Sequence, residues 1–135
     1  MSEKSKKKIL VIEDNLQINR IYVSKFQFEG MEVSTASNGD EGLEKIQAEE
    51  PDLILLDIML PGKSGFEVLK IIKENPQTKN IPVLILTNLS QTEEQKKGEK
   101  LGAEDYFVKT NTSIFQVVKK AKEILQRSNT SKQLE

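Results

Sequence analysis

The sequence predicts an α/β protein in which a parallel β-sheet is covered by helices on both faces. Short apolar runs alternate with longer segments whose apolar residues recur at helical spacing, and this alternation occurs five times along the chain. No internal repeat and no linker interrupts it. Because two parallel strands need a crossover connection, which is usually a helix, strict strand–helix alternation is typical of a doubly wound parallel sheet.

Five short apolar runs predict the strands. Two of them, 52–57 and 82–87, are nearly continuous in apolar residues, which is typical of strands buried on both faces. The first run is compact and β-prone, and the second alternates only weakly. The runs are ILVI (9–12), MEVSTA (31–36), DLILLD (52–57), PVLILT (82–87) and DYFVK (105–109).

The segments between these runs predict helices, and each has a stop signal at its end. The first three span 15–28, 40–49 and 66–74, and they are followed by Gly30, Pro51 and the pair Asn75-Pro76. Their apolar residues recur three or four positions apart. These are Ile18, Ile21, Tyr22 and Phe26 in the first helix, Leu43 and Ile46 in the second, and Phe66, Leu69 and Ile72 in the third.

The last two helices are predicted from capping motifs. Ser90-x-x-Glu93 resembles a capping box and predicts a helix that ends near Gly102. Ser113-x-x-Gln116 predicts the start of a final helix with the clearest apolar stripe in the chain. That stripe consists of Ile114, Val117, Val118, Ala121, Ile124 and Leu125.

Length and composition indicate one compact domain. The chain has 135 residues, of which 36% are apolar and 30% charged, and its formal net charge is −1. We expect a single domain over residues 1–127 with its core at 7–126, followed by a polar, frayed tail at 128–135.

The near-neutral charge argues against a dedicated nucleic-acid binder. The absence of histidine and cysteine excludes catalysis and metal binding by those side chains, and also disulfides.

The amino-terminal segment does not have the pattern of a secretion signal. Lysines lead directly into the run 9–12, without the longer apolar stretch and small-residue cleavage site that a signal peptide needs. No apolar run approaches the length of a membrane span. We therefore expect a soluble, cytoplasmic protein.

Chemically useful side chains stand at the ends of four predicted strands. The first strand ends in Glu13 and Asp14, the third in Asp57, the fourth in Thr87 and the fifth in Lys109. In a parallel sheet these ends share one edge, where such folds bind their ligands. The first and third strands are expected to be neighbours, which would bring three carboxylates together.

Three adjacent carboxylates require a compensating charge. At contact distance each pair costs about 4 kcal/mol at an effective dielectric near 20. A protein offsets this cost by shifting a pKa or by binding a cation, and ligand oxygens without His or Cys favour Mg²⁺, with Mn²⁺ as an alternative. Lys109 and Thr87 would add an ammonium and a hydroxyl. Together these groups are suited to phosphoryl transfer.

Each of these residues has an ordinary structural explanation when it is taken alone. Asp14-x-x-Gln17 resembles a capping box, so Asp14 is also a candidate cap of the first helix. Glu13 is a candidate solvent-facing strand end, and Asp57 a candidate loop residue before Pro61. Thr87 and Lys109 are common residue types in a strand and on a surface. The joint pattern favours a site, because these explanations would have to coincide at four strand ends.

At these residues the sequence resembles the receiver-domain family of response regulators. The matching segments are ILVIEDN, DLILLDIMLPGKSGFEVL, PVLILTN and LGAEDYFVKT, and the resemblance covers roughly residues 7–126. It implies a flavodoxin-like, doubly wound (βα)5 fold of three layers with a five-stranded parallel sheet in the order 2-1-3-4-5.

The resemblance also implies a role for individual residues. Asp57 resembles the phosphoacceptor, and Glu13 and Asp14 resemble the acidic pair that helps to hold Mg²⁺. Met59 resembles the position whose backbone carbonyl also binds the metal. Thr87 resembles the switch residue whose hydroxyl moves onto the phosphoryl group, and Tyr106 the switch aromatic that turns inward when Thr87 moves. Lys109 resembles the lysine that binds phosphate.

The sequence departs from the family pattern at two positions. Thr110 follows the lysine where the family often has a proline joined by a cis peptide. A cis bond before a residue other than proline costs about 2.5–4 kcal/mol, so we expect a trans or strained loop. Asn88 follows Thr87 where the family often has Ala or Gly. We expect this larger polar side chain to narrow access to Asp57 or to hold a water molecule. Both departures bear on the rates of phosphorylation and dephosphorylation.

The implied function is a switch in a two-component phosphorelay, not a turnover enzyme. Because the chain has no histidine, the phosphoryl donor must be external, either a histidine kinase, a His-phosphotransfer protein or a small acyl phosphate. The surface formed by the fourth helix, fifth strand and fifth helix would signal to a downstream protein or output domain, as a monomer or a phosphorylation-dependent dimer, without direct contact to nucleic acid or membrane. The fourth helix, with little apolar anchoring over 91–100 and with Gly98, is a candidate moving part.

Three other functions fit parts of the pattern. A non-phosphorylated adaptor of the same fold would act only as a binding module, and the complete set of acids with Thr87 and Lys109 argues against it. A flavin-binding electron carrier would need a hydroxyl- and Gly-rich loop after the first strand, where this chain has EDNLQ. A phosphatase with an aspartyl nucleophile usually has a second acid two residues later, where this chain has Met59.

Overall fold

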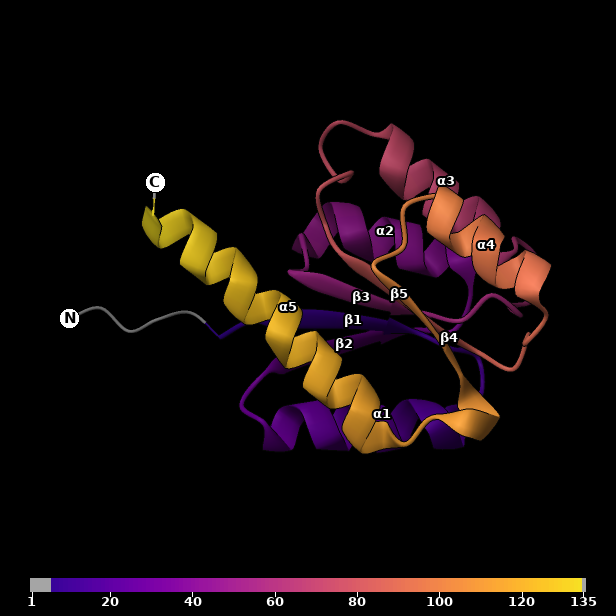
Figure 1. Ribbon diagram of the computed structural model, residues 1–135, viewed down its shortest axis with the longest axis horizontal. Coiled ribbons are helices and arrows are strands. Elements are labelled where there is room, and N and C mark those ends of the chain that lie inside the picture. Colours follow the sequence, from indigo (N-terminus) through magenta and orange to yellow (C-terminus); the bar gives the residue numbers. More distant parts are fainter. Residues whose placement is uncertain (1–5, 135) are drawn as a thin grey trace.

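A computed structural model describes residues 6–134, with side chains described through residue 127. Strands and helices alternate in the predicted order (Figure 1). The strands are β1 (Lys8–Ile12), β2 (Glu32–Ala36), β3 (Leu53–Leu56), β4 (Val83–Thr87) and β5 (Asp105–Val108). The helices are α1 (Leu16–Phe28), α2 (Gly39–Glu49), α3 (Gly65–Glu74), α4 (Thr92–Lys100), the short 3₁₀ helix η1 (Lys109–Asn111) and α5 (Ile114–Leu134).

The sheet is parallel throughout and has the strand order β2-β1-β3-β4-β5, which confirms the predicted fold. The central strands β3 and β4 are buried along their whole length, as their continuous apolar runs indicate. β1 lies beside β3, with Ile12 in register with Leu56. This pairing aligns the residues that follow the two strands.

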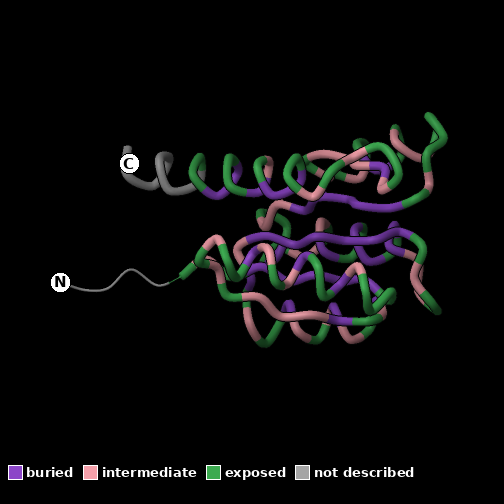
Figure 2. The backbone as a smooth tube through the Cα atoms, turned by 90° about the horizontal axis from the view of Figure 1, so that it is seen from below, coloured by how far each residue is buried: buried purple, intermediate pink, exposed green. Residues whose placement is uncertain are grey.

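Helices cover both faces of the sheet and divide the core into two layers. One layer contains residues of α1 and α5, among them Phe26, Val117 and Ile124. The other contains residues of α2 and α3, with α4 along its edge (Figure 1). Figure 2 shows that the buried residues are concentrated in the strands and on the inner sides of the helices.

The start of α1 corrects two expectations. Asn15, not Asp14, is the N-cap, because the Asn15 side chain accepts a hydrogen bond from the backbone amide of Ile18 at 3.0 Å. The alternative that Asp14 only caps this helix is therefore wrong. Ile21 was expected on the inner face but is 55% exposed, whereas Tyr22 and Phe26 are buried.

The ends of α4 and α5 also differ from prediction. Ser90 and Glu93 do not form a capping box, because α4 begins at Thr92 after the N-cap Gln91, and no side chain caps it. Ser90 instead offers its backbone carbonyl to the side chain of Gln95. The last helix, α5, ends at Leu134, within the segment 128–135 that the sequence analysis assigned to a polar tail. The side chains of the predicted tail, 128–135, lie outside the described residues.

Candidate functional site

The sheet register brings the residues at three strand ends together. Glu13 and Asp57 each follow the paired residues Ile12 and Leu56, and the backbone amide of Asp57 donates to the carbonyl of Ile12 at 3.0 Å. Both carboxylate side chains are buried. Lys109, the predicted end of the fifth strand, lies one position beyond the observed end of β5 and is the first residue of η1.

The Lys109 ammonium lies between the two buried carboxylates. Its Nζ is 2.8 Å from Glu13 Oε1 and 2.9 Å from Asp57 Oδ2. Burial alone would lower the pKa of Lys109, but the hydrogen bonds and charges of its two partners outweigh burial and raise that pKa above the ordinary value. The lysine is therefore protonated at neutral pH.

Asp14 completes a cluster of three acids. Glu13, Asp14 and Asp57 each offer a carboxylate oxygen, and these oxygens lie within 4.8 Å of one another. Asp14 is exposed, so the cluster opens to solvent on its side. With all groups ionised, three carboxylates and one ammonium leave two uncompensated negative charges. A divalent cation bound by oxygen atoms would balance them.

The pKa of Glu13 is raised above its ordinary value. Burial is the main cause, and the negative charge of Asp57 adds to it, while hydrogen bonds from Lys109 and from the backbone amide of Asn15 act in the opposite direction. The amide of Asn15 donates to Glu13 Oε2 at 3.0 Å. Ionised Glu13 is thus held in place at an electrostatic cost that a cation would reduce.

Two asparagines support Glu13, and the sequence analysis did not single them out. Asn15 caps α1 through its side chain and holds the Glu13 carboxylate through its backbone amide. Asn19 is buried, and its Nδ2 donates to the Glu13 backbone carbonyl at 3.3 Å. A signal for Asn19 was present, because it shares one helix face with Tyr22 and Phe26 at the spacing of buried positions.

The loop after Asp57 is fixed by backbone contacts. The amide of Met59 donates to Asp57 Oδ1 at 3.0 Å, so Lys109 and Met59 bind different oxygens of this carboxylate. Gly65, the first residue of α3, packs directly against the loop, and a Cβ there would lie 2.3 Å from the backbone oxygen of Asp57. Only glycine lets α3 approach the carboxylate's backbone this closely.

Thr87 and Tyr106 lie on β4 and β5, the two strands that follow β3 in the sheet. Thr87 is fully buried at the end of β4. The hydroxyl of Tyr106 donates to the backbone carbonyl of Leu89 at 2.7 Å, which links β5 to the loop between β4 and α4. Burial, with the charges of Glu94 and Asp57, raises the pKa of Tyr106 to about 12, so the phenol stays protonated and donates at neutral pH.

The residues at the two departures from the family pattern, Asn88 and Thr110, are both exposed. Asn88 is exposed directly after Thr87. Thr110 lies in η1, and the peptide bond that joins it to Lys109 is trans, as are the other peptide bonds of the described residues. The chain therefore presents Lys109 from a 3₁₀ turn without a cis bond.

Comparisons with known proteins agree with this geometry. The sequence profile of the family described as response regulator receiver domain matches residues 9–122. The chain is 36% identical over 121 residues to the phosphate regulon transcriptional regulatory protein PhoB of Rhizobium meliloti, covering 90% of this chain and 53% of that protein. It is 40% identical over 122 residues to the alkaline phosphatase synthesis transcriptional regulatory protein PhoP of Bacillus subtilis, covering 90% of this chain and 50% of that protein. The chain thus spans about half the length of the curated relatives it matches.

Solved structures of similar chains have the same fold. A CheY-like receiver domain protein from Methanospirillum hungatei superimposes with a TM-score of 0.87 at 29% identity, covering 94% of this chain and 99% of that one. A receiver domain of a Francisella response regulator gives a TM-score of 0.83 at 33% identity, covering 90% of this chain and 98% of that one.

Among the described residues, every helix is too short or too polar to span a membrane.

A five-stranded parallel sheet in this order, with helices on both faces, is also the fold of the receiver domains among the solved structures. The chain belongs to the family of response-regulator receiver domains of two-component systems. Receiver domains are signalling switches. Family membership removes the flavin carrier and the phosphatase as alternatives.

Proposed function

We propose that this receiver domain takes up a phosphoryl group on Asp57 in a Mg²⁺-dependent reaction and passes the signal through its α4–β5–α5 surface. The observation that carries the proposal is the position of the Asp57 carboxylate. It is buried, yet it shares an acid cluster with Glu13 and with exposed Asp14, and its Oδ2 is 2.9 Å from the Lys109 ammonium.

The donor set fits a hard divalent cation. Its three carboxylates offer oxygens that lie within 4.8 Å of one another, and no His or Cys is available. Carboxylates of Glu13, Asp14 and Asp57 would hold the metal, and the backbone carbonyl of Met59 is the fourth candidate ligand. Bound there, Mg²⁺ or Mn²⁺ would neutralise charge on the phosphoryl oxygens.

Asp57 acts as the nucleophile. One carboxylate oxygen attacks the phosphorus of a phosphohistidine, a P–O bond forms and the P–N bond breaks. The electron pair of the broken bond stays with the imidazole, which takes up a proton from solvent. Lys109 exchanges its contact with the carboxylate for one with a phosphoryl oxygen, so its charge remains paired throughout.

The product changes the charge and the hydrogen bonding next to Thr87 and Tyr106. An acyl phosphate adds about −1.5 to −2 charge units and several acceptors. We infer that the Thr87 hydroxyl turns toward the new acceptors, and that the Leu89 loop and Tyr106 move with it, because Leu89 is bonded to both residues. Movement of this loop would displace the start of α4.

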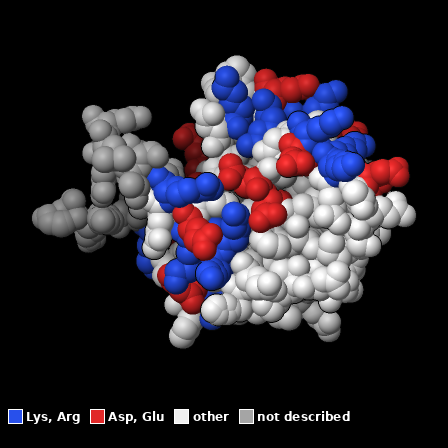
Figure 3. Space-filling view, viewed as in Figure 1, with Lys and Arg blue, Asp and Glu red and all other residues white. Residues whose placement is uncertain are grey.

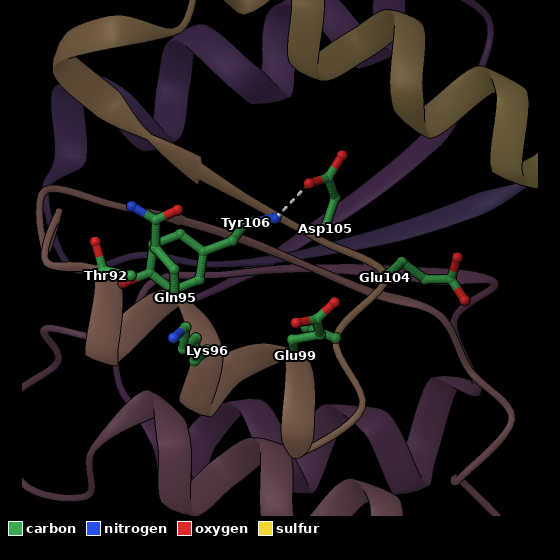
Figure 4. A pocket seen from close by; sticks show the side chains of 8 residues that line it. Thr92, Gln95, Lys96, Glu99, Glu104, Asp105 and Tyr106 are labelled. Carbon is green, nitrogen blue, oxygen red and sulfur yellow. Dashed lines mark hydrogen bonds between the residues drawn. The ribbon is translucent and has the colours of Figure 1, made fainter.

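The signalling surface contains a hollow between α4 and β5. It has a volume of about 300 Å³, and most of the residues that line it have a polar or charged side chain (Figure 4). Thr92, Gln95, Lys96 and Glu99 line it from the helix, and Tyr106 lies on its strand side. A change in the position of Tyr106 would therefore alter the surface that a downstream protein or an output domain contacts.

Family membership supports a class of phosphodonor and a class of target. A histidine kinase or a His-phosphotransfer protein supplies the phosphoryl group, since this chain has no histidine.

Two similar chains support the chemistry: a receiver domain of Klebsiella pneumoniae RstA was solved as BeF3-activated, and the cyanobacterial phytochrome response regulator RcpA was solved phosphorylated. The matched relatives named above are transcriptional regulators, so a DNA-binding output partner or domain is the first target to test.

Mass spectrometry tests the proposal directly. We expect one phosphoryl group to be added when the protein is incubated with acetyl phosphate and Mg²⁺, and none when a chelator is present. Asp57→Asn should gain no mass, whereas the matched control Asp40→Asn should behave as wild type, because Asp40 is an exposed residue that pairs with Lys63. A wild-type chain that gains no mass from either acetyl phosphate or a phosphohistidine donor would instead be the non-phosphorylated adaptor.

A further inference from the structure

α4 is held in the fold by few contacts. Its nine residues are all polar or charged apart from Gly98, which is also the only buried one. The apolar side chains of Leu89 and Leu101 pack against the core, but they lie outside the helix, one before it and one at its C-cap. Charged side chains of both signs cover the surface where α3 and α4 lie (Figure 3). Because helices in proteins are stabilised mainly by a packed apolar face, the position of α4 depends on contacts of another kind.

One of these contacts is a lysine over an aromatic ring. The ammonium of Lys97, on α4, lies 4.6 Å from the centre of the Phe66 ring, on α3. A cation at this distance is attracted by the negative face of the ring. No carboxylate of the described residues forms an ion pair with Lys97, so the ring is the partner of its charge. An exposed lysine thus joins α4 to a buried side chain of α3.

Phe66 connects this contact to the phosphoryl site. It is the second residue of α3 and directly follows Gly65, which packs against the backbone oxygen of Asp57. A capping box between Ser64 and Glu67 fixes the first turn of the helix around these two residues. Since no space is left between Gly65 and the backbone of Asp57, we expect a movement of that backbone to reach the Phe66 ring.

The chain after α4 is held at a second point on α3. Gly102, two residues after the helix, has a φ of +105°, and a Cβ on it would lie 3.3 Å from Cγ of Lys73. The Lys73 ammonium donates to the backbone carbonyls of Lys79 and Ile81, at 3.0 and 2.8 Å, so its side chain is fixed. The contact of Lys97 can therefore open while the chain after α4 stays in place.

We propose that Lys97 and Phe66 form a clasp that holds α4 against α3 in the unphosphorylated protein, and that phosphorylation of Asp57 has to open it. This inference rests on the proposed function and extends it by a second connection between Asp57 and α4, in addition to the one through Leu89 and Tyr106. A contact that is made in only one of two states shifts their equilibrium toward that state. Loss of the clasp should therefore favour the displaced position of α4.

Hydrogen exchange in the unphosphorylated, metal-free protein tests the clasp itself. Lys97→Met removes the charge and keeps a side chain of similar length. It should speed amide exchange in α4 about two- to fivefold relative to the amides of β4, as expected for an exposed cation–π contact. In a protein that already carries Phe66→Leu, Lys97→Met should have no further effect, because the ring is gone. Lys97→Arg keeps a cation over the ring and should exchange like wild type.

Lys96→Met is the matched control. Lys96 is the preceding residue of α4, is exposed and lines the hollow between α4 and β5 (Figure 4). Any effect of a lost positive charge on the helix dipole appears in both variants. Exchange in α4 should stay close to wild type in Lys96→Met, so the difference between the two variants reports on the ring contact alone.

Phosphoryl uptake tests the opening step. With acetyl phosphate and Mg²⁺, Lys97→Met should take up the phosphoryl group at about two to five times the wild-type rate, because a larger share of the protein is already in the state that phosphorylation favours. Lys97→Arg and Lys96→Met should match wild type. Mass spectrometry of samples taken over time measures all four proteins.

Three results would overturn the proposal. The first is equal exchange in α4 for Lys97→Met and Lys96→Met, since the ring contact would then hold nothing. The second is faster exchange in Lys97→Met with unchanged or slower phosphoryl uptake, because the clasp would then be structural only. The third is a wild-type protein that takes up no phosphoryl group. That result would contradict the proposed function and the opening step together, while the exchange data would still decide whether the clasp holds α4.

Discussion

Glu13 ties the stability of the protein to pH. Its folded-state pKa lies above the ordinary value because burial and Asp57 outweigh Lys109. For such a group, the contribution to stability is complete below the unfolded-state pKa and is lost as pH rises through the folded-state pKa. The metal-free protein should therefore be destabilised by ionisation of Glu13 as the solution becomes less acidic.

Glu13→Gln tests this linkage. Because glutamine cannot ionise, the variant should gain stability relative to wild type as pH rises from about 4 to about 8, close to and above the ordinary range of carboxyl groups. Urea unfolding at several pH values, in a chelator, measures the difference. Added Mg²⁺ should reverse the ranking, because only the wild type offers the full set of carboxylates. A difference that did not vary with pH would contradict the raised pKa.

Removal of the Lys109 ammonium should leave two buried carboxylates without their counter-charge. Breaking a buried ion pair from one side costs about 3 kcal/mol or more, and Lys109 itself is mostly buried. We expect Lys109→Ala to lower the free energy of unfolding by about 3 kcal/mol without metal and by less in Mg²⁺. The control Lys63→Ala removes a surface pair with Asp40 and should cost less than about 1 kcal/mol. Equal losses for both variants in urea unfolding would mean that burial of the acid cluster is unimportant.

α4 packs on the sheet although its sequence has almost no apolar side chain. Its residues Glu94–Lys100 include one buried position, Gly98, and that glycine lies against β4 and β5. A Cβ on Gly98 would be 2.8 Å from Ile85 Cδ1 and 3.1 Å from the Tyr106 ring. The helix approaches the sheet closely only because this position has no side chain. The gain of about 1 kcal/mol that alanine usually brings to a helix interior is offset here by steric contact.

Gly98→Ala should therefore displace the Tyr106 ring. The ring is held from its other end by the hydrogen bond to Leu89, so the added methyl group and this bond compete. We expect the hydrogen bond to lengthen or break, with a change in overall stability within about 1 kcal/mol. The chain has no Trp and two Tyr, so ring NMR signals report on Tyr106 without ambiguity once Tyr22→Phe identifies the other. Unchanged Tyr106 signals would show that Ile85 alone accommodates the methyl group.

Elements were predicted well where local periodicity determines them. The apolar runs at 9–12, 52–57 and 82–87 became strands within a residue or two of the predicted ends, because continuous burial needs continuous apolar sequence. The cap of α4 was predicted at Ser90, one residue before the observed N-cap Gln91, because the capping-box pattern is present but its side-chain hydrogen bonds do not form. Ile21 fits the helical spacing but faces solvent, which periodicity alone does not distinguish from burial.

The candidate site was predicted from the residues at the strand ends. This prediction was possible because of the architecture of the whole sheet. A parallel sheet aligns the carboxyl ends of its strands, so Glu13, Asp57 and Lys109 meet although they are far apart in sequence. The strand order itself followed from the family resemblance, because alternation of strands and helices does not specify which strands are neighbours. The support of Glu13 by Asn19 depends on one tertiary hydrogen bond and was missed.

The packing of α1 against α5 was also outside the reach of sequence analysis. The two helices contribute to one layer of the core on the same side of the sheet. Glu29 and Lys122, joined by an ion pair, are separated by most of the chain. Contacts between both ends of a sequence can be found only once the fold is known.

Metal binding should raise the stability of the whole fold, because the acid cluster exists only when β1 and β3 are paired. A ligand that binds only the folded state at 100 times its dissociation constant adds about 2.7 kcal/mol, which corresponds to a melting temperature roughly 10 °C higher for a domain of this size. Asp14→Asn and Asp57→Asn should lose most of this increase, and Asp40→Asn should retain it, because Asp40 is remote from the cluster. Thermal melts followed by circular dichroism, with Mg²⁺ and then with a chelator, measure the effect. A Mg²⁺ shift of equal size in Asp57→Asn would place the metal at another site and remove the electrostatic basis for phosphorylation at Asp57.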